Sequence, residues 1–351
     1  MYGGLKMMRA AVFHDVKDIR VEEVEKPVLK PNQVLLEVAW AGICGSDIGI
    51  YNYGLGKEPH PITNHAGKTI MGHEFSGTVI ESGTEVSDFN KGDRVCVEPL
   101  IYCGTCPACK QGFYNQCQSV GFVGINCHGG FAKYVAVDSK MLHKLPENVS
   151  LEEGALVEPT AVSFYGVKES KLKVGDTVII YGAGPIGLLT LLCVKAAGAA
   201  KIVVVDISEE RCKKAEELGA SLVVKGDAED LVQQILTYTN GGADVVFDCA
   251  GVQSTVNNAL YTTKMGAQIM LLATFKKPVE IDSNIVMFKA LHLTSTLAYR
   301  NVFPTVIDLI SEGRLDVTSV VTSKIDLANI VSEGFETLLN DIKQSKILVK
   351  P

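Results

Sequence analysis

The chain has 351 residues, of which 47% are hydrophobic and 21% are charged, and its formal net charge is −7. This length favours two domains, each able to bury its own core. The negative charge argues against the basic face that nucleic-acid binding requires, so we expect no nucleic-acid partner.

The first half of the chain is patterned as short strands. From about Ala10 to Ser150, alternating apolar segments such as VLLEVAWAGI and FSGTVIESG are separated by turn residues. Long helical periodicity is missing there, which predicts a mostly β, barrel-like domain. The opening run MYGGLKM precedes this pattern, and we interpret it as a short leader without function.

A cluster of four cysteines interrupts these strands, in the run CGTCPACKQGFYNQC. Two-residue gaps bend the backbone so that the four thiolates can converge on one ion, which predicts a structural zinc site at Cys103, Cys106, Cys109 and Cys117. Disulfides and incidental buried thiols are the alternatives, but the chain is large enough to fold without covalent links. Other cysteines are scattered singly and are expected to be small core residues: Cys96, Cys127, Cys193, Cys212 and Cys249.

After about Leu151 the pattern changes to apolar strands that alternate with helical stretches, from TVIIYGAGPIGLL to AQIMLLATF. This alternation predicts βαβ units around a parallel sheet, so the fold class is α/β with a separate, mostly β domain. Near the end, KALHLTSTLAYR predicts a last strand of this sheet. The segment FPTVIDLISEGR predicts a helix that returns to the first domain.

One uncharged stretch, Thr177 to Val194, is long enough to suggest a membrane span. Glycines and a proline interrupt its middle, so a strand, a tight turn and a buried helix fit better. The first ten residues also lack the apolar core of a signal peptide. We therefore expect a cytoplasmic protein without a membrane partner.

The run GAGPIG follows the strand TVIIY directly and opens an apolar helix, which is the context that a dinucleotide fingerprint requires. Gly182 allows the tight turn, Gly184 lets the backbone approach a pyrophosphate, and Gly187 lets helix and strand pack closely. Pro185 and Ile186 begin the helix, whose N-terminus would face the phosphates. The alternative is a glycine turn without a ligand.

Asp206 ends the next strand, IVVVD. A carboxylate there accepts hydrogen bonds from the adenosine ribose hydroxyls and repels a 2′-phosphate, so NAD(H) is favoured over NADP(H). Arg211 follows and could cover the adenine or the ribose. Alone it would admit NADP, but beside Asp206 this is the minor interpretation.

A second set of metal ligands is dispersed along the chain: Cys44 in GICGSD, His73 and Glu74 in MGHEFSG, and Glu158 in LVEPTAV. A thiolate, an imidazole and a carboxylate from separate elements suit a catalytic zinc, which keeps one position open for water or substrate. Taken singly, each of these residues is as well explained as part of the core. Their combination with the cysteine cluster and the glycine turn indicates a metal.

The order of these motifs resembles the zinc-dependent medium-chain dehydrogenase/reductase superfamily, from about Arg9 to the C-terminus. The resemblance implies a GroES-like catalytic barrel over residues 1–157, with the structural zinc lobe at about 96–118. It also implies a Rossmann NAD-binding domain over 158–297 and a segment, 298–351, that returns to the barrel. Relatives form homodimers or homotetramers through the edge of the Rossmann sheet, which implies a homo-oligomer here.

The resemblance also implies the site residues and two zinc ions per chain, one catalytic and one structural. Cys44 and His73 match the constant ligands of the catalytic zinc, and Glu74 matches the carboxylate ligand of the polyol-dehydrogenase branch. Glu158 matches a glutamate that lies near the metal or replaces another ligand on it. Six residues match positions that line the nicotinamide: Leu272, Ala273, Thr274, Thr296, Leu297 and Ala298.

The implied mechanism is that zinc promotes ionisation of a secondary alcohol, whose hydride passes to the nicotinamide. Ser46 is placed to hydrogen-bond the reacting oxygen and pass its proton outward, and its alternative role is a helix cap. This branch commonly has a histidine where the chain has Gly49. We therefore hypothesise that water or a nearby group such as Tyr51 replaces the usual relay.

Several segments resemble the branch that interconverts 2,3-butanediol and acetoin and reduces diacetyl: HPITN before MGHEFSG, ALVEPTAV, the Tyr299-Arg300 pair, and the ending EGFETL…KILVKP. Sorbitol-oxidising relatives usually have an arginine where this chain has Ala298, and loss of that donor suits a small diol. Oxidation of sorbitol, another polyol or L-threonine remains the alternative. An alternative of another class is a non-catalytic or zinc-less relative.

Overall fold

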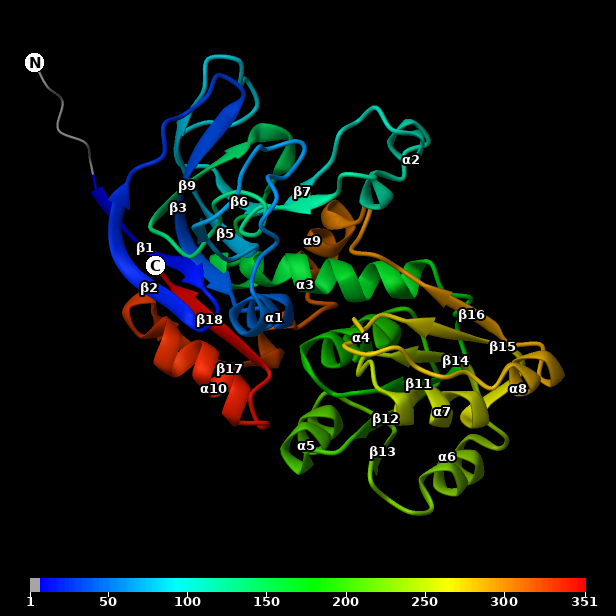
Figure 1. Cartoon of the computed structure of the whole chain (residues 1–351). Helices are drawn as coiled ribbons and strands as arrows, with labels where there is room; N and C mark the ends of the chain where they lie inside the picture. The colour runs from blue at the N-terminus through cyan, green and yellow to red at the C-terminus, as the bar shows by residue number, and fades with distance from the viewer. Residues whose placement is uncertain (1–6) are drawn as a thin grey trace, which may run out of the picture. The chain divides into compact units, whose positions relative to one another are not determined.

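The computed structural model describes residues 7–351 and contains two compact units (Figure 1). The first comprises the described residues up to Glu158 together with 303–311 and 321–351, and the second comprises 159–302 and 312–320. The expected leader lies outside the described residues except for Met7. That residue is instead the first of strand β1 (Met7–Asp15).

The first unit is mostly β, as expected. Within the described residues, its larger sheet has the order β10-β6-β5-β3-β18-β17, with β9 also paired to β3. These strands are β3 Gln33–Gly42, β5 Glu74–Ser82, β6 Arg94–Val97, β9 Tyr134–Asp138, β10 Leu142–Lys144, β17 Val321–Asp326 and β18 Lys346–Lys350. A smaller sheet has the order β2-β1-β4, with β2 Asp18–Glu25 and β4 Thr69–Ile70. A short pair joins β7 Leu100–Ile101 to β8 Gly121–Phe122.

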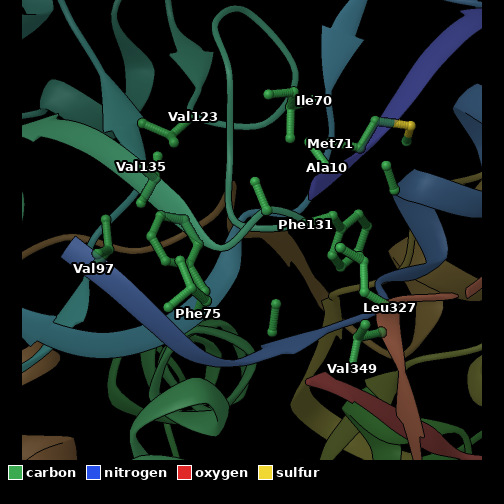
Figure 2. Packing of buried hydrophobic residues seen from close by; sticks show 14 of the residues in the cluster. Ala10, Ile70, Met71, Phe75, Val97, Val123, Phe131, Val135, Leu327 and Val349 are labelled. Carbon is green, nitrogen blue, oxygen red and sulfur yellow. The ribbon is translucent and has the colours of Figure 1, made fainter. Parts of the chain in front are cut away.

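Alternating apolar residues of these strands meet in one core (Figure 2). Phe75 of β5 and Phe131, which precedes β9, are buried in it beside Val135. Leu327 and Val349 reach the same core from the C-terminal part of the chain. Each large apolar side chain stabilises the fold by about 1.5–3 kcal/mol when fully buried. The barrel core therefore depends on segments from both ends of the described chain.

The second unit has a parallel sheet with the order β13-β12-β11-β14-β15-β16. This is the doubly wound Rossmann order and confirms the expected fold class. Its strands are β11 Thr177–Tyr181, β12 Lys201–Asp206, β13 Leu222–Lys225, β14 Ala243–Asp248, β15 Thr263–Leu271 and β16 His292–Ser295. Its connecting helices are α4 Pro185–Ala196, α5 Glu209–Glu217, α6 Leu231–Thr239, α7 Gln253–Thr262 and α8 Ser283–Phe288.

The other helices are α1 Gly45–Tyr53, α2 Pro107–Lys110, α3 Leu151–Lys168, α9 Phe303–Ser311 and α10 Glu336–Asn340. The boundary between the two units falls within α3, after Glu158. The uncharged stretch from Thr177 forms β11, a turn and α4, as predicted. In the part of the chain that the structure describes, no helix is both long and apolar enough to cross a membrane.

One expected boundary differs in the structure. We expected residues 298–351 to return to the barrel together, but 298–302 and 312–320 group with the second unit. Arg314 explains part of this difference, because its Nη2 donates to the carbonyl of Ala196 at the end of α4, at 3.2 Å. Helix α9, between these two segments, belongs to the first unit as expected.

Candidate metal centre and nucleotide site

Cys44 and His73 come together where α1 begins. Cys44 follows β3 and is the N-cap residue of α1, and its backbone N–H donates to Oδ2 of Asp47 at 2.9 Å. Asp47 is fully buried, and its Oδ1 lies 3.5 Å from Nδ1 of His73. Nε2 of His73 is 3.3 Å from the hydroxyl of Ser46. Asp47 thus contacts both candidate ligands. Because Cys44 is the N-cap residue, the alternative role of Ser46 as the helix cap is wrong.

The donor atoms of Cys44, His73 and Glu74 all lie within 4.8 Å of one another. Glu74 begins β5, directly opposite Gly42 of β3, two residues before Cys44. A sulfur, a nitrogen and an oxygen donor at this spacing fit Zn²⁺. Burial opposes a charged imidazole, but Asp47 and then Cys44 outweigh it and raise the pKa of His73 well above its ordinary value. The site therefore favours positive charge, which a metal ion supplies.

Lys346 is a site residue that the sequence did not reveal. Its Nζ lies 2.7 and 2.6 Å from the two carboxylate oxygens of Glu74 and 3.2 Å from the carbonyl of Ile43. Lys346 is 2% exposed and Glu74 is 1% exposed, so this ion pair is screened very little by water. Burial would lower the pKa of Lys346, but Glu74 and then Cys44 raise it. The lysine is therefore charged in the folded protein.

Glu158 lies outside the group of three donors that converge within 4.8 Å. It is nevertheless buried, and its charge contributes to the raised pKa of Lys346, so it is close to the same site. The structure thus brings together Cys44, His73 and Glu74 and places Glu158 beside them.

The hypothesis that Tyr51 relays the proton conflicts with its position. Its hydroxyl donates to Oε1 of Glu336 at 2.7 Å, and its ring packs on Phe335. Burial, followed by the hydrogen bond to Glu336, raises the pKa of Tyr51 to about 12. A Cβ atom at Gly49 would meet no heavy atom within 4 Å. Water at Gly49 is therefore the better candidate for the relay.

The four lobe cysteines also converge, with sulfur atoms within 4.8 Å of one another, and none of them forms a disulfide. The backbone N–H groups of Thr105 and Cys106 point at the sulfur of Cys103, at 3.4 and 3.3 Å. These donors lower the pKa of Cys103 to about 6, which favours the thiolate. Four sulfurs with backbone donors fit a structural zinc ion.

The glycine turn has the geometry that its sequence predicts. Gly182 has a φ of +93°, and a Cβ atom there would lie 3.0 Å from Cβ of Ala250. A Cβ atom at Gly187 would collide with the carbonyl oxygen of Gly182. Gly184 is the N-cap of α4, and Pro185 is the first residue of that helix. The first N–H groups of α4 therefore remain available to an anion.

Asp206 and Arg211 lie beside this turn. Oδ2 of Asp206 accepts from the N–H of Ala183 at 2.6 Å, and Oδ1 accepts from Ser208 at 2.8 Å. A Cβ atom at Gly184 would be 3.8 Å from Nη1 of Arg211. The carboxylate at the end of β12 and the guanidinium from α5 thus lie beside the glycine turn, and the carboxylate is at the position expected of a ribose-binding group.

The six residues that match nicotinamide-lining positions lie in two loops of the second unit. The N–H groups of Leu272 and Ala273 donate to the carbonyl of Asp248 at 2.9 and 3.0 Å, and Thr274 follows them. The hydroxyl of Thr296 is buried and has no hydrogen-bond partner among the described residues. Leu297 is 53% exposed, and Ala298 has a φ of +48°. The buried hydroxyl fits a group that a bound cofactor would pair.

Family models match both units. The "Alcohol dehydrogenase GroES-like domain" matches residues 30–147 and "Zinc-binding dehydrogenase" matches residues 185–312. (R,R)-butanediol dehydrogenase of Bacillus subtilis is 42% identical and covers 98% of this chain and 100% of its own length. Sorbitol dehydrogenase of the same organism is 32% identical, over 91% of this chain and 90% of its own length.

Solved structures agree with these matches. The crystal structure of 2R,3R-butanediol dehydrogenase from Bacillus subtilis has a TM-score of 0.93, over 98% of this chain and 99% of that chain. A zinc-binding dehydrogenase from Sinorhizobium meliloti 1021, bound to NADP, has a TM-score of 0.91 at 32% identity, over 99% of this chain and 100% of that chain.

Substitution of Lys346 by Met should strongly destabilise the metal-free protein. The change leaves the buried carboxylate of Glu74 without its cation, which costs about 3–5 kcal/mol of unfolding free energy. Saturating zinc should restore part of the loss, because the ion supplies positive charge at the same carboxylate. Urea unfolding with and without zinc measures both effects.

Lys350→Met, at the exposed end of β18, is the matched control and should change stability by less than about 0.5 kcal/mol. Equal stability of the two variants would contradict this role of Lys346.

Cys106→Ser should remove one zinc ion per chain. The variant lacks one of four thiolates, and a three-sulfur site holds zinc much more weakly. Elemental analysis by mass spectrometry should give two zinc ions per wild-type chain and one in the variant. Cys96→Ser, at a buried cysteine of β6 that is not one of the four converging cysteines, should keep two. A single zinc in the wild-type protein would refute one of the two metal sites.

Proposed function

The chain belongs to the zinc-binding alcohol dehydrogenase family, and on that basis we propose that it interconverts a small vicinal diol and its hydroxyketone with NAD(H). The proposed pair is 2,3-butanediol and acetoin, and reduction of diacetyl is included. The observation that carries the proposal is 42% identity to a butanediol dehydrogenase over 98% of the chain. The convergent donors of Cys44, His73 and Glu74 support it.

Zinc bound at these donors would supply a Lewis acid beside the reacting hydroxyl, and NAD(H) would accept or donate the hydride. The protein's part is to set charge and orientation. With zinc bound, a thiolate at Cys44 and a carboxylate at Glu74 would supply two negative charges, and Lys346 would offset one of them. A divalent ion bound there would offset negative charge from these donors and from the nearby carboxylates of Asp47 and Glu158, and it would favour ionisation of the alcohol. Asp47 keeps the imidazole of His73 fixed from its Nδ1 side.

Ser46 is the proposed proton carrier. Its hydroxyl lies 3.3 Å from Nε2 of His73, at the candidate metal site. It would accept the proton of the substrate hydroxyl and donate its own proton to water. The open space at Gly49 can admit that water, whereas the hydroxyl of Tyr51 is engaged by Glu336.

Apolar surface beside the candidate zinc favours a small substrate. The ring of Phe122 lies edge-on to His73, with ring centroids 6.2 Å apart. An apolar ring suits the methyl groups of butanediol better than the hydroxyls of a polyol. Ala298 also lacks the donor that the resemblance assigns to the sorbitol-oxidising branch. Sorbitol remains the second candidate because sorbitol dehydrogenase is 32% identical over 91% of the chain.

We propose NAD(H) rather than NADP(H) because the carboxylate of Asp206 would repel a 2′-phosphate. We also propose a cytoplasmic location. All ten cysteines are free thiols, which is typical of proteins in a reducing compartment.

Assays with NAD(H) and NADP(H) should identify the substrate. We expect kcat/KM for acetoin and 2,3-butanediol to exceed that for sorbitol and L-threonine by about tenfold or more, because specific contacts are worth about 1–3 kcal/mol. NAD(H) should be preferred over NADP(H). Cys44→Ser is the control for background activity and should abolish turnover. Faster oxidation of sorbitol or threonine would overturn the substrate, and no activity with any alcohol would favour a non-catalytic relative.

A homo-oligomer is proposed from the edge of the Rossmann sheet. All four residues of β16 are exposed, and β16 pairs only with β15 among the described residues. Nearby apolar side chains are also exposed, including Phe288 at 71% and Met287 at 63%. An unprotected edge strand with apolar neighbours is a surface that a second copy can cover.

Leu293→Lys, in the middle of β16, should therefore weaken self-association. A lysine at this position adds like charges across a two-fold contact and discourages edge pairing. Light scattering during size-exclusion chromatography should show a dimer or tetramer for the wild type and smaller species for the variant. Val174→Lys places a charge at another exposed apolar residue of the second unit and should have no effect. A monomeric wild-type protein would refute the oligomer.

A further inference from the structure

Asp248 is the last residue of β14, and its side chain is fully buried. Its Oδ1 accepts hydrogen bonds from the N–H groups of Ala250 and Gly251, both at 2.9 Å. Its Oδ2 accepts from the hydroxyl of Thr255, in the first turn of α7, at 3.0 Å. One carboxylate therefore fixes the turn 249–251 and joins it to the following helix.

The backbone of Asp248 holds a second loop. Its carbonyl oxygen accepts from the N–H groups of Leu272 and Ala273, as described above. In the sheet, Asp248 pairs with Tyr181 of β11 on one side and with Leu271 of β15 on the other. β11 leads directly into the glycine turn, and β15 leads into residues 272–274 (Figure 1). Asp248 thus lies between the two loops that were assigned to the cofactor.

The turn 249–251 packs against both of those loops. A Cβ atom at Gly182 would lie 3.0 Å from Cβ of Ala250, and one at Gly251 would lie 2.9 Å from the carbonyl oxygen of Thr274. Gly251 also has a φ of +69°, which an L side chain rarely adopts. Because packed interiors transmit small displacements, a shift of this turn would move the glycine turn or residues 272–274.

We propose that Asp248 is a positioning residue for the nicotinamide cofactor, which holds the turn 249–251 in the shape that keeps both cofactor loops in place. The inference rests on the proposed nucleotide site but not on the identity of the alcohol. A carboxylate suits this role because one oxygen accepts two backbone donors while the other accepts a hydroxyl. Such bonds fix the loops before the cofactor arrives, so less ordering is needed on binding.

The test is direct binding of NADH to the full-length, zinc-loaded protein, followed by the fluorescence of the nucleotide. Asp248→Ala removes all three side-chain hydrogen bonds and should raise the Kd for NADH about tenfold or more, a cost of about 1.4 kcal/mol. The KM for the cofactor should rise similarly, with kcat changed by less than about threefold. Asp248→Asn keeps an oxygen for Ala250 and Gly251 and offers an N–H to Thr255. It should stay within about threefold of the wild type.

Asp244→Ala is the matched control on the same strand. Asp244 is the second residue of β14, at the other end of the strand, where it accepts from the N–H of Thr177 at 2.9 Å and pairs with Lys264 at 2.8 Å. Its loss should lower the melting temperature while the Kd for NADH stays within about twofold of the wild type. If Asp248→Ala does not fold, Thr255→Val removes one of the three hydrogen bonds and should raise the Kd by about threefold.

Two results would overturn the inference alone. The first is wild-type affinity for NADH in Asp248→Ala, or in Thr255→Val if Asp248→Ala does not fold. The second is an equal loss of affinity in Asp244→Ala. The second result would mean that the affinity follows general stability. A wild-type protein that does not bind NADH would overturn the proposed function together with the inference.

Discussion

The buried ion pair between Lys346 and Glu74 constrains the candidate metal centre. A lone carboxylate at 1% exposure would be costly, and a lone lysine at 2% exposure would be as costly. Together they can remain charged, with Nζ satisfied by both carboxylate oxygens and the carbonyl of Ile43. Gly42 makes this possible, because a Cβ atom there would collide with the carboxylate. The charge at the metal donors thus depends on a strand pairing between β3 and β5 and on a residue from β18.

The candidate nucleotide site depends on a different constraint, the order of parallel strands. In a doubly wound sheet the carboxyl ends of neighbouring strands lie at one edge, so the loops after them form a common surface. Here β12 ends in Asp206, β11 leads to Gly182, and β14 ends in Asp248. Each loop is fixed by hydrogen bonds to backbone N–H groups, so the surface is shaped before any ligand is bound.

Local patterns predicted the parts of the site that are contiguous in sequence. The cysteine spacing and the glycine turn each lie within a short segment, and the alternation of strands and helices predicted the parallel sheet. Lys346 could not be predicted, because a lysine in KILVK is typical of an exposed strand position, and its partner is 272 positions away. A helix start near Ser46 was considered, but the extent of α1 was not predicted, because GSDIGIYNY has no apolar stripe. The orientation of Tyr51 depends on Glu336, which no local pattern reveals.

Because Glu74 and Lys346 are far apart in sequence, the order of synthesis affects when the metal centre can form. The second unit is nearly continuous, mainly from 159 to 302, whereas the sheet that carries Glu74 is completed only by β18. During synthesis the continuous unit can fold while the barrel, although begun earlier, still lacks a central strand. Until Lys346 leaves the ribosome, Glu74 lacks the cation that pairs with it in the folded protein. Metal acquired by a nascent chain would then meet a more negative set of donors than metal acquired by the finished protein.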